Sequence, residues 1–161
     1  LEEKKKPSNF IYKIPALSEN QTIKNNNNNK SEIVNKIDPN IKNKAAKGQF
    51  KQQVFMDWEG KCAVTSLSDP NLLSFAYIKP WGQCSHKERY DSCNGLLLLP
   101  SLKHLLNRGF ISFDDNGKIL ISDQLSQINQ DILNINTDMC LYKIDSKLKN
   151  YLNFHRKNVF N

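Results

Sequence analysis

The sequence predicts an α+β domain preceded by a disordered or extended N-terminal arm. Residues 110–122 contain two β-prone apolar runs around an Asn-Gly pair, which is the pattern of a β-hairpin. Apolar residues recur at helical spacing both before and after this hairpin. Residues 1–45, in contrast, offer few side chains that could fill a core. We therefore expect a low-complexity basic arm over residues 1–45 and a folded domain over residues 46–161.

The arm carries most of the positive charge. Residues 1–50 contain 10 Lys and five acidic residues, and the whole chain has a net charge of +7. Ten of these 50 residues are Asn, including the run from Asn25 to Asn29. Such a segment buries too little apolar surface to fold alone. We expect it either to be solvated or to contact a partner, either nucleic-acid phosphates or an acidic protein surface.

A helix is predicted at the start of the domain, over about residues 45–58. Phe50, Val54 and Trp58 recur at intervals of four residues and so lie on one apolar face. Gly60 follows directly, and glycine is suited to end a helix. The helix is therefore expected to pack this face against the rest of the domain.

Two strands separated by a loop are predicted next. Residues 62–65 form a short strand or a turn, and residues 72–78 form a strand. The polar segment 81–92 contains a glycine and is expected to be a loop. Asn94-Gly95 marks a turn before a run of four leucines, 96–99, which is suited to a buried strand.

The remaining predicted elements are, in order, one short helix, the hairpin and two C-terminal helices. Ser101 is the candidate N-cap of that short helix, which is expected to end before Gly109. The hairpin turns at Asn116-Gly117. Two C-terminal helices are predicted over residues 124–138 and 145–158, the second with apolar residues at helical spacing.

The cysteines and the lack of long apolar runs predict an intracellular protein, cytoplasmic or nuclear. No run of about 18 apolar residues suggests a membrane span, and no secretion signal is evident, so no membrane contact is expected. Cys62, Cys84, Cys93 and Cys140 form no C-x-x-C pair. A zinc site built from the first three with His86 is one alternative. Free thiols in a reducing compartment are the preferred interpretation.

Six short motifs follow one another in a distinctive order. They are Cys62-Ala-Val-Thr, Ala76-Tyr-Ile-Lys-Pro-Trp81, Asn94-Gly-Leu-Leu-Leu98, Leu102-Lys-His-Leu-Leu-Asn-Arg-Gly109, Phe110-Ile-Ser-Phe-Asp-Asp-Asn-Gly117 and His155-Arg-Lys-Asn-Val-Phe160. Together they resemble the restriction-type HNH endonuclease family over roughly residues 47–160. The resemblance implies a ββα-metal core with flanking helices. In that family a histidine activates water, and a divalent metal stabilises charge on the scissile phosphate.

The resemblance also implies that the catalytic positions are changed. Aligned on Arg108-Gly109, Lys103 stands where the helix histidine would bind the metal, and Asn107 stands where an acid would be. Tyr77 stands at the position of the first histidine, so only Asn94 remains of the three residues that name the motif. With a pKa near ~10, tyrosine is a poor base, and an ammonium group opposes a dication. No metal or other cofactor is therefore expected, and Mg or Zn is expected only if the site is active.

Some motif residues are expected to serve the structure. Asn94 is expected to pin a loop through its side-chain hydrogen bonds. Pro80 and Trp81 are expected to cap the core next to the first strand. His155 lies in a predicted terminal helix and is expected to be structural.

Three functions are compatible with these features. The first is a catalytically degenerate HNH-like domain that binds nucleic acid, and the second is a structural subunit whose arm contacts a protein partner. The alternative is an active DNA endonuclease with a rebuilt centre of Tyr77, His86 and His104. We favour the two non-catalytic functions. The residues expected to contact phosphates are the basic ones around the predicted cleft, namely Lys79, Lys87, Arg89, Lys103 and Arg108.

Overall fold

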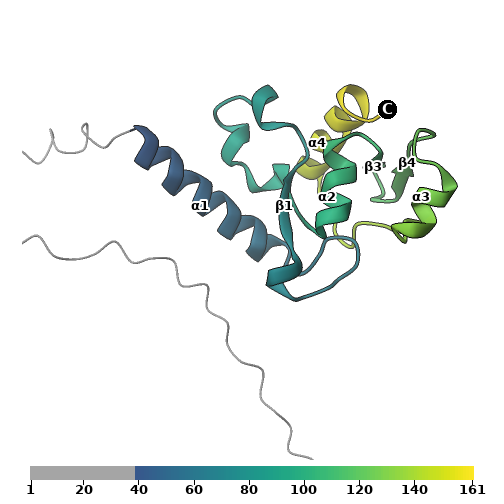
Figure 1. Ribbon diagram of the computed structural model, residues 1–161. Helices are drawn as coiled ribbons and strands as arrows, with labels where there is room; N and C mark the ends of the chain where they lie inside the picture. Colours follow the sequence, from purple (N-terminus) through teal and green to yellow (C-terminus); the bar gives the residue numbers. More distant parts are fainter. Residues whose placement is uncertain (1–38) are drawn as a thin grey trace, which may run out of the picture. The chain divides into compact units, whose positions relative to one another are not determined.

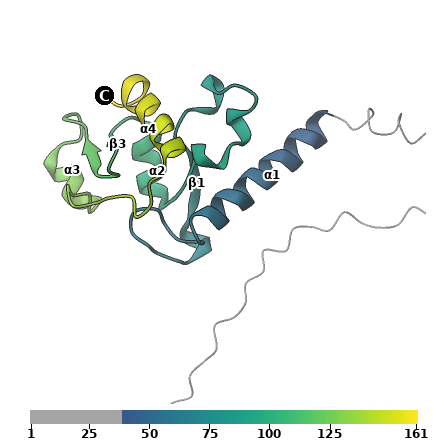
Figure 2. The same ribbon diagram turned by 180° about the vertical axis from the view of Figure 1, so that it is seen from behind.

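The computed structural model describes residues 39–161, with side chains from residue 43, and it confirms the predicted α+β fold (Figure 1; Figure 2). Of the predicted arm over residues 1–45, residues 1–38 lie outside the described residues, and residues 39–45 belong to the first helix. The helices are α1 (Pro39–Asp57), α2 (Pro100–Asn107), α3 (Gln127–Ile132) and α4 (Ser146–Asn158). The strands are β1 (Ser74–Tyr77), β2 (Gly95–Leu98), β3 (Ile111–Phe113) and β4 (Ile119–Ile121). Four 3-10 turns complete the order, η2 (Pro70–Leu72), η3 (Trp81–Gln83), η4 (Glu88–Tyr90) and η5 (Ser92–Asn94).

A ββα unit forms the centre of the domain. Strands β1 and β2 pair antiparallel, with Phe75 opposite Leu97 and Tyr77 opposite Gly95. Helix α2 follows β2 at once and packs against β1. It begins at Pro100 rather than after Ser101, so the predicted N-cap is wrong. Proline suits the first helical position because its missing N–H would have no partner there and its φ is already helical.

The second hairpin is confirmed. Ile111 lies opposite Ile121 in the antiparallel pair of β3 and β4. Within the turn, the Asp114 carboxylate accepts hydrogen bonds from the backbone N–H groups of Asn116 and Lys118, each at 2.8 Å. Gly117 has φ +84°, a left-handed conformation that glycine adopts without strain. The turn chemistry of the sequence therefore fixes this hairpin.

Two helices differ in length from the prediction. Helix α1 begins at Pro39, before the predicted start near residue 45; residues 43–49 are almost all exposed, so no apolar periodicity marks this part of the helix. Helix α3 covers only Gln127–Ile132 of the predicted 124–138, with Ser126 as its N-cap. Asn134 has φ 53°, which ends helical geometry. The missed start of α1 thus reflects exposed helical residues, whereas the early end of α3 reflects the left-handed conformation of Asn134.

One core joins the elements. Phe50, Val54 and Trp58 of α1 are buried at 3%, 0% and 4% exposure, as the spacing predicted. They pack with the leucines of β2 and with α2, β3 and α4. Among the described residues, no helix has the length and apolar character needed to cross a lipid bilayer.

Gly95 allows α1 to pack closely on β2. A Cβ at this position would lie 2.3 Å from Val54 Cγ2 and 3.0 Å from Phe50 Cζ. Its φ of −119° is ordinary for a strand, so the constraint is space and not backbone conformation. Gly95 therefore begins β2 directly after the 3-10 turn η5, which ends at Asn94, so the predicted turn lies just before the strand.

We predict that Gly95→Ala lowers the free energy of unfolding by about 1–3 kcal/mol, because the added methyl group overpacks the α1–β2 contact. Urea unfolding followed by circular dichroism measures this change. Gly48→Ala is the control, because nothing lies within 4 Å of that site on α1. It should be neutral or stabilising by up to ~1 kcal/mol. Equal effects of the two substitutions would contradict the packing argument.

Candidate functional site

A cavity of about 380 Å³ lies at the junction of β1, η3 and α2. It brings together Tyr77, Lys103 and Asn107, the three positions at which the resemblance implied a change of catalytic group. The rest of the lining is mostly apolar or aromatic. The complete set of lining residues is Phe75, Tyr77, Ile78, Pro80, Trp81, Lys103, Asn107, His155 and Val159.

Tyr77 is held as a hydrogen-bond donor. Its hydroxyl donates to the backbone carbonyl of Arg89 at 3.1 Å, and its ring stacks on Phe50 with centroids 4.6 Å apart. Burial, followed by the neighbouring Cys84 and Tyr90, raises the pKa of Tyr77 to about 12. The hydroxyl therefore stays protonated near neutral pH and is a poor general base.

Lys103 supplies the positive charge of the cavity. It lies on α2 and is partly buried, and its side chain makes no hydrogen bond or ion pair with any described residue. Asn107, one helical turn further on, is exposed and lines the same cavity. An unpaired ammonium group among aromatic rings, beside a neutral amide, is suited to bind an anion.

The side chain of Asn94 ties the loop to the strands, as the sequence predicted. It is fully buried, and its Oδ1 accepts a hydrogen bond from the Lys79 backbone N–H at 2.8 Å. Its Nδ2 lies within 3.3 Å of the Lys79 and Glu88 carbonyl oxygens and 3.2 Å from Cys84 Sγ. Two N–H groups thus serve three acceptors. Asn94 fixes the loop after β1 and does not line the cavity.

Lys79 already has a partner. Its Nζ donates to both carboxylate oxygens of Glu88, at 2.8 and 2.9 Å, and lies 4.6 Å from the Phe154 ring centroid. These hydrogen bonds, with those from Ser85, lower the pKa of Glu88 to about 2. The carboxylate is therefore charged at neutral pH, and Lys79 is neutralised locally. It lies outside the lining of the cavity.

A chain of ring contacts separates His86 from Tyr77. Trp81 packs edge-on against Tyr77, with centroids 5.5 Å apart, and against Tyr90, at 5.7 Å. His86 packs on the far side, against Tyr90, at 5.4 Å. The guanidinium group of Arg89 lies 5.1 Å from the Trp81 ring centroid.

The remaining predicted residues are exposed. His104 lies on α2 beside Lys103 but outside the cavity lining, as do Lys87 at the start of η4 and Arg108 at the end of α2. Of the proposed rebuilt centre, the cavity therefore contains Tyr77 and neither His86 nor His104. Of the predicted phosphate contacts, it contains Lys103.

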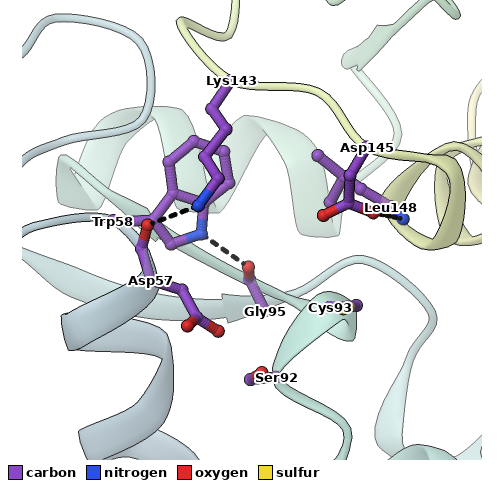
Figure 3. Close-up of a pocket in the computed structure, with 8 residues that line it drawn as sticks. All are labelled: Asp57, Trp58, Ser92, Cys93, Gly95, Lys143, Asp145 and Leu148. Carbon is purple, nitrogen blue, oxygen red and sulfur yellow. Dashed lines mark hydrogen bonds between the residues drawn. The ribbon is translucent and has the colours of Figure 1, made fainter.

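A second pocket, of about 240 Å³, lies near the start of α4 (Figure 3). Lys143 Nζ donates to the Asp57 carbonyl oxygen at 3.2 Å, and Asp145 caps α4 through the backbone N–H of Leu148. Cys93 is the only lining residue that the sequence analysis proposed for a site. Because most of its polar groups are bonded to one another, this pocket is part of the packing between α1, η5 and α4.

The cysteines do not assemble the alternative zinc site. Cys62 is fully buried in the core, Cys84 lies against Asn94, and Cys93 lines the second pocket. Burial raises the pKa of Cys84, and burial with the neighbouring Asp91 raises that of Cys93 to about 11. Zinc binds thiolates, which these environments disfavour. Nowhere in residues 43–161 do three or more His, Cys, Asp or Glu side chains gather as a metal site.

The cavity residues do not fit the family's metal ion. Divalent metals are bound by imidazole, carboxylate or thiolate groups, whereas the polar lining of the cavity consists of a tyrosine, an amide, an ammonium group and one imidazole. His155, the one imidazole in the lining, has both nitrogens engaged. Its Nε2 lies 3.0 Å from the Leu106 carbonyl oxygen and its Nδ1 lies 2.9 Å from Ser112 Oγ.

His155 is a structural residue, as the sequence predicted. A carbonyl oxygen can only accept, so Nε2 carries the proton and Nδ1 accepts from the Ser112 hydroxyl. Burial lowers the pKa of His155, because the neutral ring is favoured away from water. The ring thereby ties α4 to both α2 and β3.

Two features of the site were missed in the sequence. Lys47 and Lys51 of α1 lie over the rings of Trp81 and Phe75, at 4.6 and 5.8 Å from the centroids. The sequence did contain a signal for these lysines, because α1 carries several lysines and a single acidic residue, Asp57, at its end. The pairing of Lys79 with Glu88 could not be predicted from the sequence, because it depends on the fold of the loop that carries Glu88.

Comparison with known families identifies the central segment. Residues 62–114 match the model of the HNH endonuclease family. The match includes β1, β2 and α2, which form the ββα unit, and it confirms the predicted resemblance for this segment. It is narrower than the predicted range of 47–160 and leaves out α1 and α4. This part of the chain is thus similar to HNH endonucleases. No curated protein matches the chain.

We predict that Asn94→Ala lowers the free energy of unfolding by about 2–4 kcal/mol, because it leaves buried backbone groups of Lys79 and Glu88 without partners. Urea unfolding measures the loss. Asn107→Ala, at an exposed position with no side-chain hydrogen bond among the described residues, should change stability by no more than ~0.5 kcal/mol. A small effect at Asn94 would show that the loop is held by other contacts.

We predict that stability falls as the pH drops below about 6.5, the ordinary pKa of histidine. A folded-state pKa lowered by burial gives a stabilisation that is complete above the unfolded value and is lost as pH falls. Urea unfolding at pH 7.5 and pH 5.5 should show a smaller loss for His155→Gln than for the unmodified chain. His86→Gln, at an exposed histidine, should keep the original pH dependence.

Proposed function

We propose that the chain is a catalytically degenerate HNH-like domain that binds the phosphate backbone of nucleic acid at the Tyr77–Lys103 cavity without cutting it. The observation that carries this proposal is the Lys103 ammonium group, which lines the cavity and has no partner among residues 43–161. A lysine binds phosphate as a point charge. In HNH enzymes the corresponding surface meets the scissile phosphate, so the fold would already present the cavity to a backbone.

Hydrolysis lacks a suitable base in this geometry. The Tyr77 hydroxyl is protonated near neutral pH and donates to a carbonyl oxygen. His86 and His104 lie outside the cavity, and the groups inside it are a poor set of metal ligands. These observations favour binding over the alternative of an active endonuclease. They are also compatible with a role as a subunit of a nucleoprotein assembly, because such a subunit would bind nucleic acid too.

The binding test is titration of a fluorescein-labelled 25-base-pair duplex DNA at several salt concentrations. Each phosphate contact made by a lysine contributes about −0.9 to the slope of log K against log salt. We expect Lys103→Gln to make this slope less negative by about 0.9 and to weaken binding several-fold. Lys118→Gln, on the exposed hairpin turn, is the control and should match the unmodified chain. An equal effect of both substitutions would contradict binding at the cavity.

The cleavage test is plasmid nicking with Mg²⁺, Mn²⁺ or Zn²⁺. We expect no metal-dependent nicking by the unmodified chain. Nicking that disappears in the combined Tyr77→Phe, His86→Ala, His104→Ala variant would support the active-endonuclease alternative and overturn the proposal. The absence of any salt-dependent DNA binding would favour a purely structural subunit.

A further inference from the structure

A row of lysines runs along α1. Lys44, Lys47 and Lys51 are exposed and lie at i, i+3 and i+7, so they share one side of the helix. With a rise of 1.5 Å per residue, the row is about 10 Å long. The only acidic residue of α1 is Asp57, at its last position. The row is therefore a rigid, uninterrupted band of positive charge.

The row is continuous with the cavity. Lys47 Nζ lies 4.6 Å from the ring centroid of Trp81, and Lys51 Nζ lies 5.8 Å from that of Phe75. Both rings also line the cavity that contains Lys103. Two aromatic side chains thus stand between the lysines of α1 and the lysine of α2, and all of them border one surface.

The lysines of this surface have no ion-pair partner among the described residues. The ion pairs among the described residues involve Lys61, Lys79 and Arg156, and none involves the α1 row or Lys103. Arg89, whose guanidinium group lies over Trp81, adds a further cation. Its Nε is buried without a hydrogen-bond partner among the described residues. The arrangement suits a polyanion that contacts several cations at once.

The geometry favours duplex over single-stranded nucleic acid. Proteins that bind single strands stack the bases on free aromatic faces. Here cations already lie over Trp81, at 4.6 and 5.1 Å, and Tyr77 is stacked on Phe50. Lysines on a rigid helix instead suit a regular backbone, where phosphate contacts set position.

The first half of α1 is also accessible to a long ligand. It extends beyond the body of the domain in both views (Figure 1; Figure 2). A hydrogen bond from the Tyr90 hydroxyl to Asn43 Oδ1, at 3.1 Å, nevertheless ties it to η4. The lysine row is thereby held in place relative to the cavity.

We propose that Lys44, Lys47 and Lys51 of α1 form, together with Lys103, one continuous track for the sugar-phosphate backbone of duplex DNA. The inference rests on the proposed function and extends it to a helix outside the segment that matches the family. The helix thus serves as a second contact surface that sets the orientation of the duplex across the cavity.

The test compares two triple variants of the full chain by the duplex titration described above. Lys44→Gln/Lys47→Gln/Lys51→Gln removes the row, and glutamine keeps a high helix propensity. Lys118→Gln/Lys147→Gln/Lys157→Gln is the matched control, because it removes the same charge from exposed lysines elsewhere. Circular dichroism and thermal unfolding confirm that both variants fold.

We expect the row variant to make the slope of log K against log salt less negative by about 2–3, near 0.9 per lost contact. The control variant should change this slope by less than about 1. Equal slopes for the two variants would overturn the track, while a retained effect of Lys103→Gln would leave the cavity proposal standing. Titrations with the single-stranded DNA of the same sequence and with duplex RNA complete the test. Tighter binding of either one than of duplex DNA would also overturn the proposal.

Discussion

The buried side chain of Asn94 is the interaction on which the rest of the site depends. Its Oδ1 accepts a hydrogen bond from the backbone N–H of Lys79. Its Nδ2 lies within hydrogen-bond distance of the carbonyl oxygens of Lys79 and Glu88 and of Cys84 Sγ. The end of β1, the loop of η3 and η4, and the start of β2 are therefore fixed to one amide. Because β1 carries Tyr77 and the loop carries Trp81, the same amide determines the shape of the cavity.

The distribution of charge follows from this loop. Folding brings Glu88 to Lys79 and so neutralises the lysine closest to the buried amide. Lys103, on the rigid helix α2, receives no such partner among the described residues. Five basic residues that looked equivalent in the sequence thus differ in kind. Lys79 is paired with Glu88, and Arg89 lies over the Trp81 ring. Lys87 and Arg108 are exposed outside the cavity, and Lys103 lines it.

Helix α1 combines two roles on different sides. Its second half inserts Phe50, Val54 and Trp58 into the core, where the absent side chain of Gly95 makes room for them. Its neighbouring side presents lysines beside Phe75 and Trp81. The helix lies outside the family match, yet its packing positions these lysines beside two rings that line the Tyr77–Lys103 cavity.

The sequence alone determined the order of elements, the hairpin turn and the HNH-like core. These features depend on local chemistry, such as the Asp-Asn-Gly turn at residues 115–117 and the apolar spacing of Phe50, Val54 and Trp58. Helix ends at solvent-exposed residues escaped prediction, because no burial pattern marks them. Only the tertiary structure decided which basic residues are paired and which one lines the cavity. Ion pairing and stacking join residues that are distant along the chain or placed in an irregular loop, and periodicity carries no information about such contacts.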